Sequence, residues 1–442
     1  MIRGFGTLKG VDRMAHFEAG AAKTDITPPV GIELAGYGYR VEHTKQATGI
    51  HDSLWIRSLA LGSSDQCVLI LVLDLLGIEL PTTRRIRSLI AERLPVSASD
   101  ILICCTHTHS GPNILQHHEK GIAVDEAWKA AMIDAAVNVA VAAFDNMKPA
   151  QIGVGKTEVR GIGANRKVRL DDGSIFHYSG MSARQPPKGR TVIEKGPIDP
   201  ELGVLCVKDR ADRVIAVLIN YACHPWLYNG SKVSSEVSGA CVELVEDQLS
   251  SENPDVVVLF APGAGSNIIT LQNQRPMPEK LREQERWFTA ERARLGGILA
   301  QTALHVVQEL TEYSDPGSIT SELCPLACPV YDRRLVAVLA EHGGLPPTDL
   351  VMDTEVQVVR AGDVVLVGLP SEVYVEYGLE IKQHSRYRDT FVLSYCNDYF
   401  ADIITHEAVR ESCCPELEWT HVHPDVRHRI MECLEHGVLD RR

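Results

Sequence analysis

The chain contains 442 residues, of which 45% are hydrophobic and 23% charged, and its formal net charge is −14. This composition is typical of a folded globular protein, and the length suffices for one large domain or about two to three ordinary ones. Because phosphate contacts need clustered lysine and arginine, the acidic balance argues against a general binder of nucleic acid or of anionic membranes. We expect a small-molecule substrate, no stable membrane association, and a surface compatible with a homo-oligomer.

Residues 1–16 are glycine-containing, mixed in charge and without an apolar core, so they do not resemble a secretory signal. We expect a flexible N-terminal extension over 1–16, followed by one domain over 17–442. No apolar run reaches the ~20 residues of a membrane-spanning helix.

The 12 cysteines include no CxxC pair. In a chain without a signal, they favour buried reduced thiols over a disulfide framework and predict a cytoplasmic protein.

Apolar runs that are typical of buried strands alternate with longer amphipathic segments that are typical of helices. The expected strands are 67–73, 101–105, 150–157, 203–207, 214–221, 256–260, 355–360, 364–367 and 390–393. The expected helices are 81–93, 124–146, 236–250 and 278–310. This alternation predicts an α/β fold with mixed β-sheets and flanking helices. Two irregular segments, 162–197 and 314–347, are long for loops and are expected to shape a pocket.

The most informative motif is Thr-His-Thr-His-Ser-Gly-Pro at 106–112, directly after the expected strand 101–105. His107 and His109 can aim at one point only if the chain bends, and Ser-Gly-Pro supplies a bend. Neutral imidazole is the commonest protein ligand for metals. Two uncharged histidines side by side would serve little packing purpose, so the motif predicts a metal site.

Three further segments share the form of a strand-like run that ends in a polar side chain able to bind a metal. They are His224 after 214–221, Glu372 after 364–367 and Asp402 after 390–393. Strand ends of α/β proteins gather at one rim, so we expect these side chains to meet His107. Two histidines and two carboxylates suit zinc, with an open position for water.

Each of these three residues has a plainer interpretation when taken alone. His224 would be a structural imidazole, which we favour by about two to one in isolation. Glu372 would be an acid near the start of a helix over 373–382, stabilised by the helix dipole. Asp402 would be a turn residue.

Four other residues have weaker signals. His51 is equally compatible with contact to a metal ligand and with a structural role, and Asp74 is a plausible acid behind the ligands. His421 and His423 form a second His-x-His pair, but no apolar strand precedes them. We therefore expect those two to lie on the surface or at a pocket rim.

Several motifs, in order along the chain, resemble the neutral/alkaline non-lysosomal ceramidase family, specifically its N-terminal catalytic domain. Besides 106–112, the matching segments are 19–29, 36–38, 49–57, 165–166, 223–225, 263–267, 369–372 and 397–399. The family is zinc-dependent and hydrolyses the amide bond of N-acylsphingosine. The resemblance therefore implies a ceramidase-like α/β domain, one Zn²⁺ per chain, and an amidohydrolase acting on carbon–nitrogen bonds other than peptide bonds.

The resemblance also implies roles for individual residues. His107, His224 and Glu372 would be zinc ligands, and Asp402 stands where the family has a tyrosine ligand. The implied catalytic residues are His109 beside the metal, Arg166 at the position of a substrate-contacting arginine, and Tyr399 on the pocket wall. The expected substrate-binding residues are Ser266 and Asn165.

In the expected mechanism, zinc activates a water molecule that attacks an amide carbonyl. His109 and Arg166 stabilise the developing oxyanion, and His109 delivers a proton to the leaving nitrogen. Ser266 is an alternative nucleophile, but we favour a tight turn there by about three to one, since no G-x-S-x-G elbow is present.

The substrate prediction follows from departures from the family. The Gly-Asp-x-Ser-Pro-Asn element of the family reads Gly-Ala-Gly-Ser-Asn at 263–267, and the chain ends without the family's C-terminal immunoglobulin-like domain. We therefore expect a short form that acts on a small soluble amide rather than on ceramide. The alternatives are a zinc-dependent ester or lactone hydrolase, and a catalytically inactive binding protein with the same fold.

Overall fold

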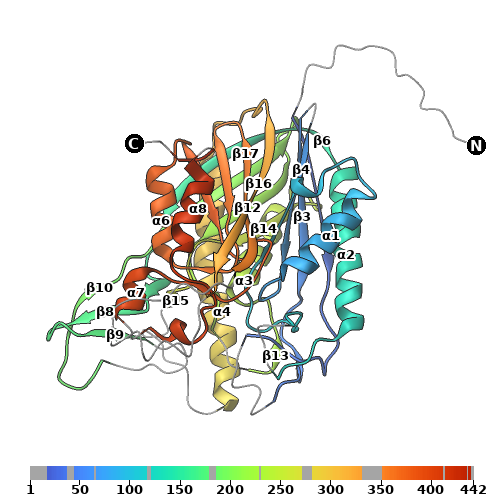
Figure 1. Cartoon of the computed structure of the whole chain (residues 1–442). Helices are drawn as coiled ribbons and strands as arrows, with labels where there is room; N and C mark the ends of the chain where they lie inside the picture. The colour runs from blue at the N-terminus through green and yellow to red at the C-terminus, as the bar shows by residue number, and fades with distance from the viewer. Residues whose placement is uncertain are drawn as a thin grey trace, which may run out of the picture.

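Two hydrogen-bonded β-sheets form the centre of the protein, and helices cover their outer faces (Figure 1). The computed structural model describes residues 17–36, 44–63, 66–116, 121–178, 186–227, 230–270, 281–330, 351–411, 414–435 and 437–439. The expected flexible extension, residues 1–16, lies outside this part of the chain.

The larger sheet has eight strands and the smaller has four. In hydrogen-bonded order the larger comprises β14 (Val257–Pro262), β12 (Val214–Tyr221), β11 (Glu201–Asp209), β6 (Lys148–Glu158), β1 (Glu18–Asp25), β3 (Trp55–Gly62), β4 (Cys67–Leu73) and β5 (Ile101–Cys105). The smaller comprises β16 (Ile319–Pro329), β17 (Val351–Ala361), β18 (Val364–Gly368) and β20 (Asp389–Leu393).

The larger sheet folds over on itself, because its two halves join only at the start of β1 and β6, through Glu18–Pro149 and Ala19–Lys148. β14 contacts β3, β4 and β5, although it stands seven places from β5 in the sheet order. In a flat sheet that separation would be about 34 Å, at about 4.8 Å per strand. Both halves and the smaller sheet therefore share one apolar core, which includes Leu59, Leu218 and Leu366.

Helices cover each outer face in pairs. α1 (Leu80–Ala91) and α2 (Glu126–Asp145) pack on the β1-β3-β4-β5 half, and α3 (Glu236–Leu249) and α4 (Leu281–Glu309) pack on the other half. α6 (Val375–His384) and α8 (Val426–Glu435) cover the smaller sheet (Figure 1). The expected α/β fold with mixed sheets and flanking helices is thus confirmed.

Three strand–helix–strand units position the candidate site. β4 and β5 are parallel and joined through α1, β12 and β14 through α3, and β18 and β20 through α6. The segment after β20 joins the carboxyl ends of two other strands: the Ser394 N–H donates to Pro262 O at 2.9 Å, and the Cys105 N–H donates to Tyr395 O at 3.1 Å. The ends of β5, β14 and β20 therefore meet.

The two segments that we expected to be irregular contain strands. Within 162–197 lie β7 (Gly163–Asn165), β8 (Lys167–Leu170), β9 (Ile175–His177) and β10 (Val192–Lys195), the last three of which form a separate small sheet at the lower left of Figure 1. Within 314–347, β16 occupies Ile319–Pro329, and residues 331–347 lie outside the described chain.

The expectation that all cysteines are reduced is wrong for one pair. A disulfide joins Cys324 in β16 to Cys433 in α8, with Cα atoms 6.0 Å apart and 109 residues between them in sequence. The other nine cysteines in the described chain are free thiols, in line with the expectation. The disulfide therefore corrects the prediction about the cysteines, and the cytoplasmic location stays a prediction.

The expectation about membrane-length apolar segments also needs correction. α2 is long and apolar enough to cross a membrane, judged by length and composition. In the folded chain its apolar residues pack on β1 and β3, with Met132, Ala136 and Ala140 in the core. Such a helix is also typical of the core of a folded domain.

Candidate metal centre

Three histidine side chains converge at the meeting point of the strand ends. The Nε2 atoms of His107 and His109 are 3.1 Å apart, and those of His107 and His224 are 3.2 Å apart. The Nε2 atoms of His109 and His224 are 2.8 Å apart. His107 and His224 are almost completely buried, with 0% and 3% exposed, so the cluster lies inside the protein.

Backbone carbonyls fix the orientation of two of these rings. Nδ1 of His107 lies 2.7 Å from Leu76 O, and Nδ1 of His109 lies 2.8 Å from Gly36 O. A carbonyl can only accept a hydrogen bond, so each Nδ1 carries the proton. In the neutral imidazole the Nε2 atom then has a bare lone pair, and the two lone pairs face the same point.

A metal ion fits this arrangement. The Nε2 lone pairs of His107 and His109, 3.1 Å apart, repel each other unless a positive charge lies close to both. Tetrahedral zinc with Zn–N bonds of about 2.0–2.1 Å would separate its nitrogen ligands by about 3.3 Å, close to the distances here. Burial, together with His107 and His109, holds the pKa of His224 well below its usual value and keeps it in the neutral form that binds metals.

Glu372 lies on the flank of the cluster. Its Oε2 atom is 3.4 Å from His107 Nε2 and 3.9 Å from His224 Nδ1, which has no hydrogen-bond partner. Burial raises the pKa of Glu372, but His107, His224 and the donating Tyr399 hydroxyl outweigh burial and hold the pKa well below its usual value. An ionised carboxylate therefore faces the imidazoles.

Asp402 lies beside Glu372, because the short strands β19 (Glu372–Val373) and β21 (Asp402–Ile403) pair in parallel with Glu372 opposite Asp402. Its Oδ1 atom accepts a hydrogen bond from the Ser266 hydroxyl. Burial, and then the negative charges of Glu372 and Glu416, raise the pKa of Asp402 well above its usual value. Two adjacent carboxyl groups of opposite ionisation thus border the histidines.

Ser266 lies in a tight turn. The Ile268 N–H donates to Gly265 O at 2.9 Å, and the Ser266 N–H donates to Val373 O at 3.1 Å. The Ser266 hydroxyl donates to Asp402 Oδ1, and the raised pKa of Asp402 makes this carboxyl group unsuited to take a proton from a serine nucleophile. This geometry matches the tight-turn interpretation of the sequence.

Arg166 reaches the same region from the segment after β7. Its Nη1 atom donates to Glu416 Oε1 at 2.5 Å, and its backbone N–H donates to Asn267 O at 2.9 Å. Burial opposes the positive charge of Arg166, but Glu416, Asp402 and Glu372 together raise its pKa. A permanent cation therefore stands near the two carboxyl groups.

The side chain of Asn165 is engaged with the backbone. Its Nδ2 atom donates to Pro197 O at 2.8 Å, and its Oδ1 accepts from the Lys167 N–H at 2.9 Å. Asn165 also pairs with Ile268 across β7 and β15 (Ile268–Thr270), and the Ile268 carbonyl accepts from the His224 N–H. Asn165 therefore joins the segment that carries Arg166 to the segment that carries His224.

Sequence reasoning missed three residues of the site. The Tyr395 ring stacks on His107, with centroids 4.0 Å apart and planes 11° apart. Glu416, in the short helix η5 (Pro415–Glu418), pairs with Arg166, and Glu236 accepts from the Ser110 hydroxyl at 2.9 Å. Tyr395 follows the expected strand 390–393 and could have been predicted from its place at the end of that strand. No sequence signal marks Glu416 or Glu236.

Two acidic residues support the histidine motif through hydrogen bonds, directly or through a serine. Asp74 accepts from Thr106 Oγ1 at 3.1 Å and from Arg57 Nη1 at 3.0 Å, next to the first histidine of the motif. Asp52 accepts from the Ser234 hydroxyl at 2.6 Å, and the Ser234 carbonyl accepts from Thr108 Oγ1. His51 bonds to Asp52 and Thr289 through its two ring nitrogens, which favours its structural role.

The backbone around the site is strained. Seven non-glycine residues in the described chain have positive φ, a conformation that L-residues rarely adopt. Six of them belong to the segments that build the site: His107 (61°), Glu236 (52°), Ser371 (61°), Tyr395 (58°), Asn397 (64°) and Ala401 (72°). Such clusters are typical of functional sites, because packing must hold the unfavourable backbone in place.

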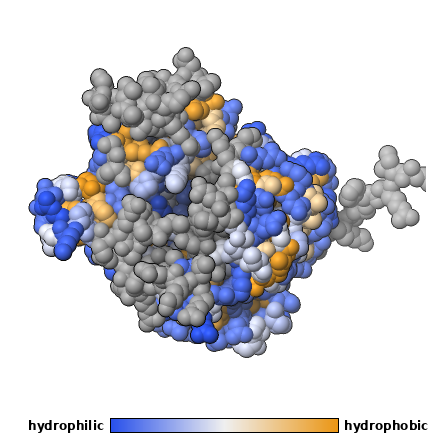
Figure 2. All heavy atoms as spheres, turned by 90° about the horizontal axis from the view of Figure 1, so that it is seen from below, coloured by the Kyte–Doolittle hydropathy of each residue, from blue (hydrophilic) through white to orange (hydrophobic). Residues whose placement is uncertain are grey.

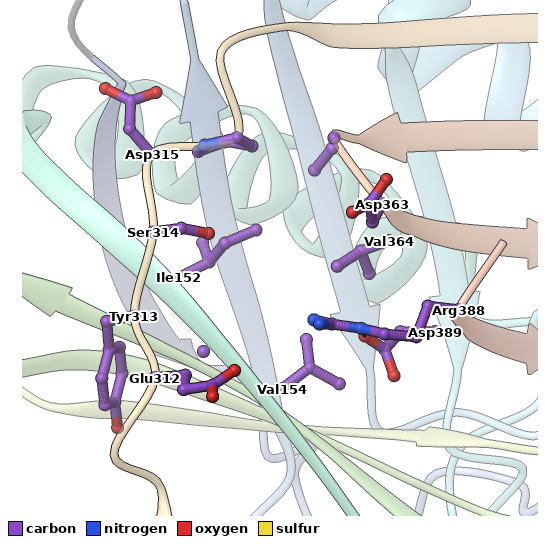
Figure 3. A pocket seen from close by; sticks show the side chains of 14 residues that line it. Ile152, Val154, Glu312, Tyr313, Ser314, Asp315, Asp363, Val364, Arg388 and Asp389 are labelled. Carbon is purple, nitrogen blue, oxygen red and sulfur yellow. Dashed lines mark hydrogen bonds and ion pairs between the residues drawn. The ribbon is translucent and has the colours of Figure 1, made fainter.

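A separate cavity of about 600 Å³ lies at the other end of β18, where the strand begins at Val364. Figure 3 shows Glu312, Asp315, Asp363 and Asp389 around this cavity, with Arg388 among them. None of the candidate site residues lines it. The cavity lies at the opposite end of β18 from Glu372, and the sequence analysis assigns no role to the residues that line it.

Comparison with known proteins agrees with this architecture. A family model described as neutral/alkaline non-lysosomal ceramidase, N-terminal, matches residues 17–268. The crystal structure of neutral ceramidase from Pseudomonas aeruginosa is similar with a TM-score of 0.76 and 18% identity, over 95% of this chain and 73% of that one. A structure of ceramidase complexed with C2 is similar with a TM-score of 0.75 and 18% identity, over 95% and 74%. No curated protein matches the chain.

The family match covers more than half of the sequence, so the chain belongs to the neutral/alkaline non-lysosomal ceramidase family, whose members are hydrolases of carbon–nitrogen bonds other than peptide bonds.

Proposed function

We propose that the protein is a zinc-dependent amidohydrolase that cleaves a small N-acyl amide. The observation that carries this proposal is the convergence of the Nε2 atoms of His107, His109 and His224 within 3.2 Å of one another, with Nδ1 of His107 and of His109 protonated on the far side of the ring. Family membership supplies the reaction class, and the donor set supports zinc over a hard, oxygen-preferring ion.

In this proposal His107, His224 and Glu372 hold the metal, with Asp402 as the fourth ligand in place of the family's tyrosine. Bound zinc would supply Lewis-acid chemistry and a water molecule acidic enough to act near neutral pH. Tyr399 acts as a positioning residue, because its hydroxyl donates to Glu372 and so directs the other carboxylate oxygen towards His107.

His109 and Arg166 act on the substrate. With Nδ1 fixed on Gly36, the Nε2 atom of His109 is the atom that can exchange a proton with the leaving nitrogen. Arg166, whose positive charge is stabilised by Glu416, is suited to stabilising the negative charge that develops on the carbonyl oxygen. Ser266 and Asn165 act mainly by holding Asp402 and the Arg166 segment.

The proposed substrate is small and soluble rather than ceramide. The departures in 263–267 are one argument. The described surface is another: its exposed large hydrophobic residues are Val30, Ile50, Ile193, Leu244, Val351 and Trp419, which come from separate elements. Figure 2, a view from below, shows a mostly hydrophilic described surface with separate hydrophobic patches. A lipid-docking surface is typically contiguous.

The first experiment is zinc analysis of wild type and His224→Ala after purification without added metal and dialysis against a weak chelator. We expect about one zinc per wild-type chain and none in the variant. His384→Ala, which alters an exposed histidine of α6, is the matched control and should keep its zinc. A folded wild type without any transition metal would refute the proposal in favour of a binding protein.

The second experiment compares short-chain N-acyl amides, the matched esters and lactones, and ceramide in mixed micelles. We expect the highest kcat/KM for the soluble amides and loss of turnover in His224→Ala. A higher kcat/KM for the matched esters would indicate an ester or lactone hydrolase instead. Preference for ceramide would overturn the substrate class and leave the metal site intact.

A further inference from the structure

A second group of potential metal ligands lies outside the candidate active site, on two helices near the C-terminal end. It consists of His406 at the start of α7 (His406–Glu411), together with Asp425 and His428 at the start of α8. One potential ligand atom of each residue lies within 4.8 Å of those of the other two. The side chains of His406 and Asp425 are 42% and 53% exposed, so solvent metal can reach the group.

The local structure presents these side chains to one another. Asp425 and His428 are three residues apart at the beginning of a helix, so they share one face. The His406 Nε2 atom is 2.8 Å from Asp425 Oδ1, which brings α7 to the same point. The neighbouring His423 donates its backbone N–H to Pro329 O at 2.8 Å, and its ring lies 5.8 Å from that of His406. Its Nδ1 atom also contacts the site, at 3.2 Å from Asp425 Oδ2.

An ion pair alone does not account for this arrangement. A His406–Asp425 pair would need only two of the three side chains and, being exposed, would contribute little to stability. His428 adds a third donor of the type that transition metals prefer, with a ligand atom within 4.8 Å of those of His406 and Asp425. The donor set of two imidazoles and one carboxylate leaves further coordination positions for water.

We infer that His406, Asp425 and His428 form an accessory site for a divalent transition metal of the zinc type, separate from the His107 cluster. The site joins the two ends of the 406–425 segment. That segment carries Glu416, the partner of Arg166, and Thr420, whose hydroxyl donates to Asp402 O at 2.7 Å. It also carries Glu407, which pairs with Lys167 next to Arg166.

The accessory metal is therefore a positioning device. It holds the starts of α7 and α8 together, so that Glu416 and Thr420 keep Arg166 and Asp402 in place. The inference rests on side chains that take no part in the proposed hydrolysis, so the two proposals can fail independently. Its occupancy depends on free zinc, because exposed sites with three protein ligands bind more weakly than buried ones with four.

The test is calorimetric zinc titration of tag-free protein that has been dialysed against a weak chelator. The proteins compared are wild type, His428→Gln, Asp425→Asn, His224→Ala and the control His305→Gln, which alters an exposed histidine of α4. We expect about one added zinc equivalent in wild type, His224→Ala and His305→Gln, and none in His428→Gln or Asp425→Asn. Elemental analysis after titration checks the stoichiometry.

A second readout is the thermal midpoint, which zinc should raise in His224→Ala but not in the double variant His224→Ala/His428→Gln. Equal zinc uptake by wild type and His428→Gln, or no added uptake by wild type, would overturn the inference. Loss of the tight zinc in His224→Ala with normal titration of the second equivalent separates this site from the active-site proposal.

Discussion

His109 is as close to the meeting point as the two histidines that we propose as ligands, with Nε2 2.8 Å from His224 Nε2. If it acts on the substrate, His109→Ala should keep its zinc and lose about 10²–10⁴-fold in kcat, the usual contribution of general acid–base catalysis. Zinc analysis and kcat are measured on the same preparation. Loss of zinc together with activity would instead make His109 a ligand.

Gly36 sets the position of His109. Its φ is +95°, and an added Cβ would lie 2.8 Å from both Cα and Nδ1 of His109. Gly36→Ala should therefore displace the His109 ring, and kcat should fall by about tenfold or more, as small misplacements of catalytic groups do.

Gly31→Ala is the matched control for this prediction. Gly31 has a similar φ of +101°, but nothing lies within 4 Å of the added Cβ. Both variants should lose about 1–2 kcal/mol of unfolding free energy from left-handed backbone, measured by urea denaturation. Only Gly36→Ala should lose activity, and equal activity in the two variants would contradict the proposed contact.

Asp398 should make stability depend on pH. Burial raises the pKa of this carboxyl from 3.8 to about 6 in the folded protein, despite hydrogen bonds from the Leu80 and Tyr399 N–H groups. The folded state thus holds the proton more tightly than the unfolded state. The unfolding free energy should therefore fall by about 3 kcal/mol as pH rises from about 4 through about 6.

The measurement is denaturant unfolding of wild type and Asp398→Asn between pH 4 and 8. Asparagine can accept the same backbone hydrogen bonds without carrying a charge. The stability of the variant relative to wild type should increase as pH rises through 6. A constant difference over this range would show that Asp398 keeps an ordinary pKa.

At the scale of elements, Asp74 joins three pieces of structure. Its carboxylate accepts from the Trp55 N–H at the start of β3, from Arg57 and from Thr106 next to His107. Asp74→Ala leaves Arg57 with a buried charge and should lower the unfolding free energy by about 3–5 kcal/mol. Thermal or urea denaturation measures the change.

The double variant Asp74→Ala/Arg57→Met is the control. Removal of both charges eliminates the uncompensated cation, so the double variant should be more stable than Asp74→Ala alone. If the double variant instead loses as much unfolding free energy as Asp74→Ala and Arg57→Met lose separately, the charge of Arg57 is compensated by its other carboxylate neighbour, Glu246, which is 3.7 Å away.

Strands that alternate with helices were predictable because they are continuous apolar runs, as in β4, β5 and β12. β1 was not predicted, since Glu18–Asp25 is rich in alanine and glycine, which have low strand propensity. Its small residues are explained by tertiary packing: a Cβ on Gly20 would lie 2.3 Å from Ala143 O in α2. β16 was hidden by Pro325 and Pro329, which are tolerated because β16 is an edge strand.

The candidate site was predictable to the extent that it follows strand ends. His107, His224 and Glu372 all stand at exits of strand–helix–strand units, and the structure brings their side chains within 4 Å of one another. Glu416 was not predictable, because it reaches Arg166 from a segment 250 residues away with no strand pattern before it. Long-range partners of this kind depend on how the elements pack.

For the whole molecule, the Cys324–Cys433 bond joins the smaller sheet to its covering helix α8 across 109 residues of sequence. Reduction of this disulfide raises the conformational entropy of the unfolded chain, so it should lower the unfolding free energy by about 2–5 kcal/mol. Denaturation midpoints with and without dithiothreitol should differ in wild type. They should coincide in Cys324→Ser/Cys433→Ser, which controls for effects of the reductant on the free thiols.

The left-handed residues around the site limit how stable the protein can become without loss of activity. At Ala401 (φ 72°) and Ser371 (φ 61°), glycine would relieve about 1 kcal/mol of backbone strain each. The same change would loosen the segments that hold Glu372 and Asp402 side by side. Selection for thermostability alone would therefore favour glycine at position 401, whereas at Ser371 the loss of the hydroxyl, which donates to Ala401 O and accepts from the Phe400 N–H, opposes the change. Selection for turnover would remove glycine at position 401, so stability and activity oppose each other there.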